Sequence, residues 1–337
     1  MKITVKKQLL LTTLVTIILL CFSQIAVGEQ SKNIKKLLQT KECPGCDLIG
    51  ASLSGAELRG ANLKGADLRR ANLKGTKLDG ANLEGAKLDK SVLNNATLKA
   101  AKLKGAMLQR TSLIGTNLFE ADLENANLQQ ALLESANLTK ANLKMANLST
   151  AMLRQASLKE ANLAGANLQS ANLELTNLEG ANLNNANLGK ARLFRTNLQA
   201  TTINEQTVLD NKWRLLWQAL YQDKSKDLAG RDLAGADLAK MNLSGVNLAG
   251  ANLEGAYLFM VNLRGANLTG TKLNNVDLKY ADLGNANLSK ASLIGANLKN
   301  VNLEKANLTG ATLDISNLQQ AFICGTIMPD GKTNTCQ

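Results

Sequence analysis

Leucine recurs at every fifth residue along most of this chain. Residues 46–200 divide into 31 consecutive five-residue units and residues 226–325 into 20 more, and leucine holds the third place in 50 of these 51 units, with Ile323 as the exception. Alanine holds the first place in 35 units, and asparagine or aspartate holds the second place in 33. Each unit therefore reads as a small residue, a polar residue and a leucine, followed by two variable places.

A period of five decides how the backbone can bury these leucines. On an α-helix, steps of five residues rotate by about 140°, so the leucines would spiral around every face and form no stripe. In a straight strand, residues five places apart point to opposite sides. The chain must therefore bend once per unit. Bends of about a right angle close a coil after four units, and coils stacked at the ~4.8 Å strand spacing pair their backbones and bury the leucines in a column.

The A-[ND]-L-x-x units, such as Ala161–Gly165 followed by Ala166–Ser170, resemble those of the pentapeptide repeat family over 255 of the 337 residues. The resemblance implies an all-β solenoid, a right-handed quadrilateral β-helix with about 20 residues per coil, in which the leucine and the small residue two places before it face inward. Four leucines and mostly four alanines then fill each coil. This leaves no internal channel for a buried ligand or substrate.

The first 28 residues have the organisation of a secretory signal peptide. Three lysines precede the apolar stretch Leu9–Phe22, and the small residues Ala26 and Gly28 follow it. The stretch is shorter than the roughly 20 residues of a spanning helix, so we expect membrane contact only before cleavage, with a retained anchor as the alternative. Removing the three lysines leaves 36 basic and 27 acidic residues, a net charge of +9. We expect an exported protein of the periplasm, the extracellular space or a thylakoid lumen, since the arrangement is similar to that of exported cyanobacterial members of the family.

Residues 201–225 interrupt the array and hold both tryptophans of the chain. Asp210 or Asn211 can cap a short helix in which Trp213 and Trp217 share one face. One interpretation is that this helix packs on the side or end of the first stack. The other is that it docks a partner or a second copy in a homodimer, because amphipathic helices rich in aromatic residues serve as groove ligands.

Both ends of the array need covers, because a bare coil exposes unpaired backbone. Residues Ser31–Thr40 predict a capping helix, with Ile34, Leu37 and Leu38 on one side. The predicted organisation is a signal peptide at 1–28, an N-terminal cap at 29–45, a first stack at 46–200, a helical insert at 201–225, a second stack at 226–325 and a C-terminal cap or tail at 326–337.

The segment from Cys43 to Cys46 has the spacing of a thiol–disulfide redox motif. Redox motifs of this type open a helix in a βαβ fold, whereas Cys46 already holds the first place of a five-residue unit. We therefore interpret Cys43 and Cys46 as a structural disulfide, with a thiol–disulfide oxidoreductase as the alternative. Cys324 and Cys336 form a second candidate disulfide, as expected in an oxidising compartment.

Residues 20 apart stack on each other if coils have 20 residues, so the sequence predicts surface columns. One column alternates in charge through Lys64, Glu84, Lys104, Glu124 and Lys144. Another carries like charges at Arg70, Lys90 and Arg110, and like charges stacked on one face are destabilising unless the side chains splay or an anion binds. Both outcomes are open from the sequence, so we take Arg70, Lys90 and Arg110, together with Trp213 and Trp217, as the candidate partner surface.

The chain contains no histidine, which removes every mechanism based on an imidazole base or ligand. No catalytic, cofactor-binding or metal-ligating residue is predicted, and no cofactor is expected. The predicted function is a non-catalytic scaffold that holds a protein partner. The alternative from the family resemblance is a DNA mimic that binds a topoisomerase, but such mimics are acidic and cytosolic, whereas this chain is basic and carries an export signal. Nucleic acid is not an expected partner, because the charge is spread over long faces with few aromatic residues.

Overall fold

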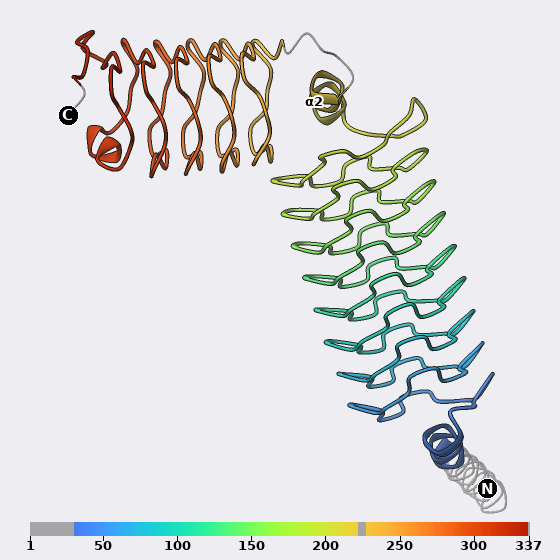
Figure 1. Ribbon diagram of the computed structural model, residues 1–337. Coiled ribbons are helices and arrows are strands. Elements are labelled where there is room, and N and C mark those ends of the chain that lie inside the picture. The colour runs from blue at the N-terminus through green and yellow to red at the C-terminus, as the bar shows by residue number, and fades with distance from the viewer. Residues whose placement is uncertain (1–29, 222–226, 336–337) are drawn as a thin grey trace, which may run out of the picture. The chain divides into compact units, whose positions relative to one another are not determined.

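The computed structural model describes residues 30–221 and 227–335 (Figure 1). The chain divides into two compact units, Met1–Met152 and Leu153–Gln337. This boundary falls inside the predicted first stack and not at the tryptophan segment. The predicted signal peptide lies outside the described residues. None of the described helices has the length and apolar character needed to cross a membrane.

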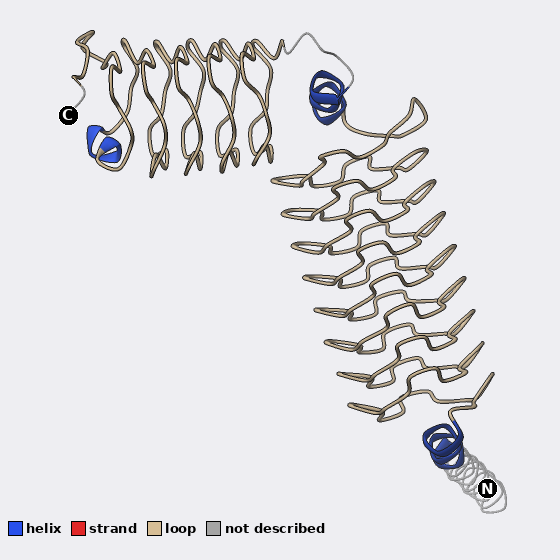
Figure 2. Ribbon diagram, in the orientation of Figure 1, coloured by secondary structure: helices blue, strands red, loops and turns tan. Residues whose placement is uncertain are grey.

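Parallel backbone bridges pair residues that are 20 positions apart. Asn62 pairs with Asn82, and Asn82 pairs in turn with Lys102. Successive bridges lie five residues apart along the chain, so four units make one coil, as the sequence predicted. Each bridge is a single second-place residue, and no longer strand is present in the described ranges, so Figure 2 draws the coils entirely as loop.

Every backbone N–H of a typical unit has an acceptor. The second-, third- and fifth-place N–H groups donate to carbonyl groups of adjacent coils, the first-place N–H donates across the bend, and the fourth-place N–H donates to the side chain at the second place. In the unit 81–85 the bonds are Ala81 N to Leu78 O (3.0 Å), Asn82 N to Ala61 O (2.9 Å), Leu83 N to Lys102 O (2.7 Å), Glu84 N to Asn82 Oδ1 (3.1 Å) and Gly85 N to Lys104 O (3.0 Å). Asparagine and aspartate recur at the second place because their Oδ1 satisfies the one N–H that no backbone carbonyl group of an adjacent coil accepts.

The core is a column of leucines and small residues. Leu63 and Ala61 are fully buried. The same holds for most residues at the first and third places of the five-residue repeats, in both compact units of the chain. Where threonine replaces the first-place alanine, its hydroxyl donates to a leucine carbonyl of the preceding coil, as Thr76 Oγ1 does to Leu53 O at 2.7 Å. Threonine therefore substitutes for alanine without leaving a buried hydroxyl unpaired.

The ladder begins and ends beyond the predicted limits. Cys43 is fully buried and its N–H donates to Asn62 O at 2.9 Å, so the cysteine occupies a leucine place in an extra unit before residue 46. At the other end of the predicted first stack, Val208 still pairs with Asn187, although one inserted residue shifts the register. Thr326 is buried and Ile327 pairs with Asn307, so one more unit follows residue 325. The repeat frame was missed in these units because cysteine, an inserted residue or a β-branched residue replaces part of the motif.

Three short segments cover or interrupt the ladders. Residues 30–40 form the predicted N-terminal helix, with Leu37 fully buried, but Leu38 is 46% exposed and does not share its face. The helix α2, Asn211–Tyr221, follows the ladder that ends at Val208. The 3₁₀ helix η1, Ile315–Leu318, replaces regular repeat geometry near the C-terminus, where the chain then turns back through an antiparallel bridge between Ile327 and Thr333.

Candidate functional site

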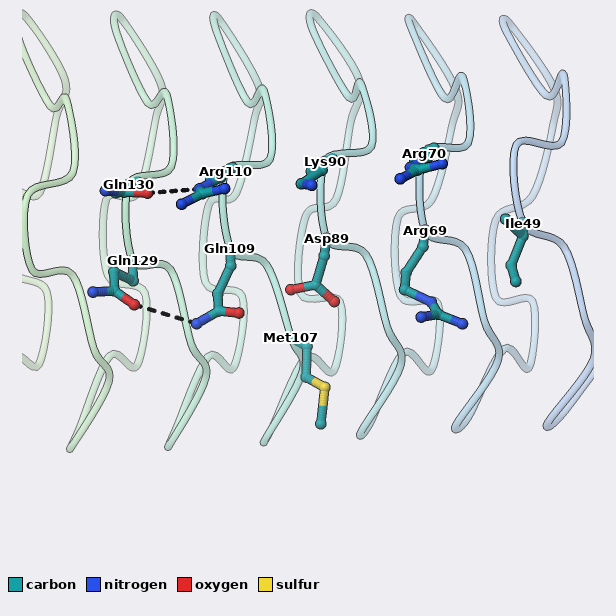
Figure 3. A pocket seen from close by; sticks show the side chains of 10 residues that line it. All are labelled: Ile49, Arg69, Arg70, Asp89, Lys90, Met107, Gln109, Arg110, Gln129 and Gln130. Carbon is teal, nitrogen blue, oxygen red and sulfur yellow. Dashed lines mark hydrogen bonds between the residues drawn. The ribbon is translucent and has the colours of Figure 1, made fainter.

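The like-charge column lines a groove on the first unit. The groove has a volume of about 710 Å³ and is lined by Ile49, Arg69, Arg70, Asp89, Lys90, Met107, Gln109, Arg110, Gln129 and Gln130. Arg70, Lys90 and Arg110 form one row along successive coils, and a second row beside it holds Arg69, Asp89, Gln109 and Gln129 (Figure 3). The structure thus brings together the three basic residues that the sequence predicted, and adds a neighbouring row that the sequence reasoning missed. These missed residues hold the fourth place of the same units.

None of the three column cations has an ion-pair partner among the described residues. Among the described residues, no carboxylate lies within ion-pair distance of Arg70 or Lys90, and both side chains are exposed. Arg110 donates through Nε to Gln130 Oε1 at 2.7 Å, which orients its guanidinium without neutralising it. The column therefore keeps three positive charges, with a glycine, Gly50, before it and the neutral Gln130 after it.

A fourth cation in the groove, Arg69, is already neutralised. Its Nε and Nη2 atoms donate to the two carboxylate oxygens of Asp67 at 2.7 and 2.6 Å. This bidentate hydrogen bond lowers the pKa of Asp67 and raises that of Arg69. Arg69 therefore differs from Arg70, although the two are adjacent in sequence.

The groove also offers backbone donors. Lys87 and Met107 stand at second places where most units carry asparagine or aspartate, so the fourth-place N–H groups of Asp89 and Gln109 have no acceptor among the described residues. Gln109 Nε2 donates to Gln129 Oε1 at 3.3 Å. The groove thus combines cations, N–H donors and the exposed apolar side chain of Met107.

The tryptophans do not form the exposed surface that one interpretation expected. Trp213 and Trp217 are each only 8% exposed. Trp217 Nε1 donates to the carbonyl and hydroxyl oxygens of Thr201 at 3.2 and 3.1 Å. The Trp217 ring therefore packs against the end of the preceding ladder. Since both rings are buried, the structure corrects their assignment to an accessible partner surface.

Three cysteines, Cys43, Cys46 and Cys324, lie near the ends of the ladders. Cys43 and Cys46 form a disulfide with a Cα–Cα distance of 5.3 Å, and the Cys43 side chain is fully buried in its leucine place. Cys324 is also disulfide-bonded, and its predicted partner Cys336 lies outside the described residues. No group of three His, Cys, Asp or Glu side chains suited to a metal ion occurs within residues 30–221 and 227–335.

An aromatic cluster on the second unit also escaped the sequence reasoning. The rings of Tyr257 and Phe259 stack at 5.9 Å, and Tyr280 meets Phe259 edge-on at 5.8 Å. The Arg195 guanidinium lies 5.6 Å from the Tyr257 centroid and Lys279 Nζ lies 4.9 Å from that of Tyr280, so the ring faces already have cationic partners. The sequence contained a signal for this cluster. Tyr257 lies 20 residues before Asp277, and Tyr280 belongs to the same five-residue repeat as Asp277.

Comparison with known families matches most of the array. A profile described as pentapeptide repeats matches residues 46–85, 227–259, 261–293 and 291–328, and a profile described as a pentapeptide repeat region matches 86–163 and 106–183. Together the matches cover more than half of the 337 residues. The comparison with curated proteins gave no match.

Several solved structures of repeat proteins are similar in sequence pattern. HetL, a pentapeptide repeat protein involved in heterocyst differentiation regulation from the cyanobacterium Nostoc sp. strain PCC 7120, is 28% identical, with 89% of this chain and 97% of that chain covered and a TM-score of 0.19. A pentapeptide repeat protein from the Arabidopsis thaliana thylakoid lumen is 31% identical over 30% of this chain and 63% of that chain, with a TM-score of 0.20. Full-length QnrB1, a plasmid-mediated fluoroquinolone resistance protein, is 16% identical, with 53% of this chain and 97% of that chain covered and a TM-score of 0.26.

Proposed function

The chain belongs to the pentapeptide repeat family, and from that membership we propose that it is an exported, non-catalytic scaffold that binds an anionic protein partner along the column Arg70, Lys90 and Arg110. Proteins of this family fold as right-handed β-helices, and the 20-residue ladder of this chain agrees with that fold. The observation that carries the proposal is the groove in which three stacked cations keep their charge.

Physical chemistry supports an anion at this place. Three exposed cations on coils about 4.8 Å apart repel one another, and the repulsion weakens when an anion lies between them. The fold does not require a charged residue at this fifth place. The neutral Gln130 stands at the same place one coil after Arg110 and has the same left-handed backbone conformation. A fixed row of like charges that the fold does not need is therefore better explained by binding than by stability.

Charge reversal tests the proposal. In the variant R70E/K90E/R110E, binding of the native partner, measured by crosslinking in the native host and pull-down, should be lost. Glutamate is tolerated at the fifth place, since Glu120 and Glu160 already adopt positive φ there. The matched control K74E/K272E/K290E changes the net charge equally, at exposed lysines whose neighbours one coil away in the same column are uncharged, and should keep the partner. Equal capture by both variants would contradict the proposal.

A further inference from the structure

The backbone donors of the groove distinguish between bound conformations. The lining runs from Ile49 to Gln129 over four coil steps, which is about 19 Å at the ~4.8 Å coil spacing. Within it, the N–H groups of Asp89 and Gln109 stand one coil apart and have no acceptor among the described residues. An extended segment has free backbone carbonyl groups that can accept from them, whereas the carbonyl groups of an α-helix are bonded within the helix.

The spacing of the three cations along the stack also indicates how far apart the acidic side chains of a bound peptide should lie. The midpoints of the pairs Arg70/Lys90 and Lys90/Arg110 lie about one coil step apart, ~4.8 Å. In an extended peptide, side chains at i and i+2 point to the same side and lie about 6.7 Å apart. The long Arg, Lys and Glu side chains can absorb the remaining difference of about 2 Å. Two acidic residues separated by one position can thus each place a carboxylate between two cations.

We infer that the ligand of this groove is an extended acidic segment of a protein, lying parallel to the axis of the stack, with acidic residues at every second position. This inference rests on the proposed function and adds the conformation and spacing of the bound segment. The intervening side chains point away from the column. The N–H groups of Asp89 and Gln109 and the exposed side chain of Met107 lie beside the column and provide donors and an apolar contact.

The lining itself argues for this orientation. Asp89 places a carboxylate in the second row, and Arg69 in that row is neutralised by Asp67. An anionic group is therefore repelled from the second row and attracted to the row of Arg70, Lys90 and Arg110, which runs along the stack. A ligand lying across the coils would meet one cation only.

Two isomeric peptides test the inference on the full-length chain. A fluorescent 12-residue peptide of alternating glutamate and threonine carries all its carboxylates on one face when extended, whereas its isomer with paired glutamates and paired threonines divides them between both faces. By fluorescence anisotropy at low salt, the alternating peptide should bind about tenfold more tightly than the isomer. The variant R70Q/K90Q/R110Q should lose this preference, and the control K64Q/K104Q/K144Q should keep it. Glutamine already holds this place at Gln130 with a positive φ of 58°, and circular dichroism of the variant checks its fold.

The other outcomes separate the two proposals. Equal binding of both isomers, weakened by R70Q/K90Q/R110Q, would overturn the extended register and leave the anion-binding column in place. Binding of polygalacturonate with no binding of either peptide, lost in the same variant, would replace the acidic peptide by an acidic polysaccharide. If no polyanion is affected by R70Q/K90Q/R110Q, both the inference and the proposed function fail.

Discussion

Two columns of the first unit run along the same stack of coils, one at the fourth and one at the fifth place of the repeat, and differ in the order of their charges. In the alternating column, Lys64 meets Glu84 at 3.1 Å and Lys104 meets Glu124 at 3.2 Å. In the basic column, Arg70 and Lys90 have no such partner among the described residues. The leucine ladder therefore fixes the position of each surface side chain. The charges at 20-residue spacing then decide whether the side chains of a column form ion pairs with each other or remain available to a ligand.

The largest expected effect comes from breaking the ladder that both columns share. Leu88 is fully buried in the unit that carries Asp89 and Lys90. Replacing it with alanine, L88A, removes a buried side chain from a column with no room to repack, and should lower the free energy of unfolding by about 2–5 kcal/mol. Urea denaturation followed by circular dichroism measures the loss.

The control for L88A is L138A, at an equally buried leucine away from the basic column. Both variants should lose stability by similar amounts, but only L88A should also weaken anion binding. A loss below about 1 kcal/mol for both would show that the leucine column is not what holds the coils together.

Exchanging the charge pattern between the columns should change stability in opposite directions. The variant K90E converts the basic column into an alternating one and adds two ion pairs, so it should raise the free energy of unfolding by about 1 kcal/mol while abolishing binding. The variant E84K makes the other column wholly basic and should lower stability by a similar amount. Thermal unfolding at 10 mM and 500 mM salt measures both, and the differences should shrink at high salt.

If K90E destabilises the protein, the side chains of the basic column already splay enough to avoid each other, and the stacked-charge comparison is wrong. The substitution itself introduces no new backbone strain, because Lys90 and Glu120 share nearly the same positive φ of 59° and 57°. Any change in stability can therefore be assigned to charge.

The sequence predicted the repeat geometry well and the exceptions poorly. Leucine at every fifth residue predicts the 20-residue coil, the buried column and the stacking of Arg70 on Lys90, because these follow from periodicity alone. It could not predict that Cys43 takes a leucine place or that Val208 continues the ladder after an inserted residue, since the motif is broken there. It also could not tell that the Trp213 and Trp217 rings are buried, because an amphipathic helix fits either a partner or its own chain.

The same limit applies to the groove. The three cations were visible as a column, but their availability depends on which neighbouring carboxylate each can reach. Asp67 neutralises Arg69 and not the adjacent Arg70, and this choice depends on side-chain directions that a repeat pattern does not encode.

The smallest expected effect compares two second-place aspartates, one in each unit. The bidentate hydrogen bond from Arg69 lowers the pKa of Asp67, whereas burial raises the pKa of Asp237 above its ordinary value near 3.8, against the opposing charge of Arg195. Asp67 therefore adds stability above about pH 3.8 that is lost as the pH falls through its lowered folded pKa. Asp237 does the reverse, because its burial penalty grows as the pH rises from 3.8 through its raised folded pKa.

Asparagine at each position separates the two cases, since its Oδ1 can still accept the backbone N–H bond that Arg69 or Ala239 now donates. At pH 7, D67N should be less stable than the parent by a few tenths of a kcal/mol and D237N should be more stable by a similar amount. Both differences should shrink as the pH falls and vanish once the pH lies below the lowered folded pKa of Asp67, where each carboxyl is protonated in both states. A D237N variant that is less stable at pH 7 would mean that the attraction of Arg195 outweighs the cost of burial. Both aspartates would then stabilise the folded protein in their charged form.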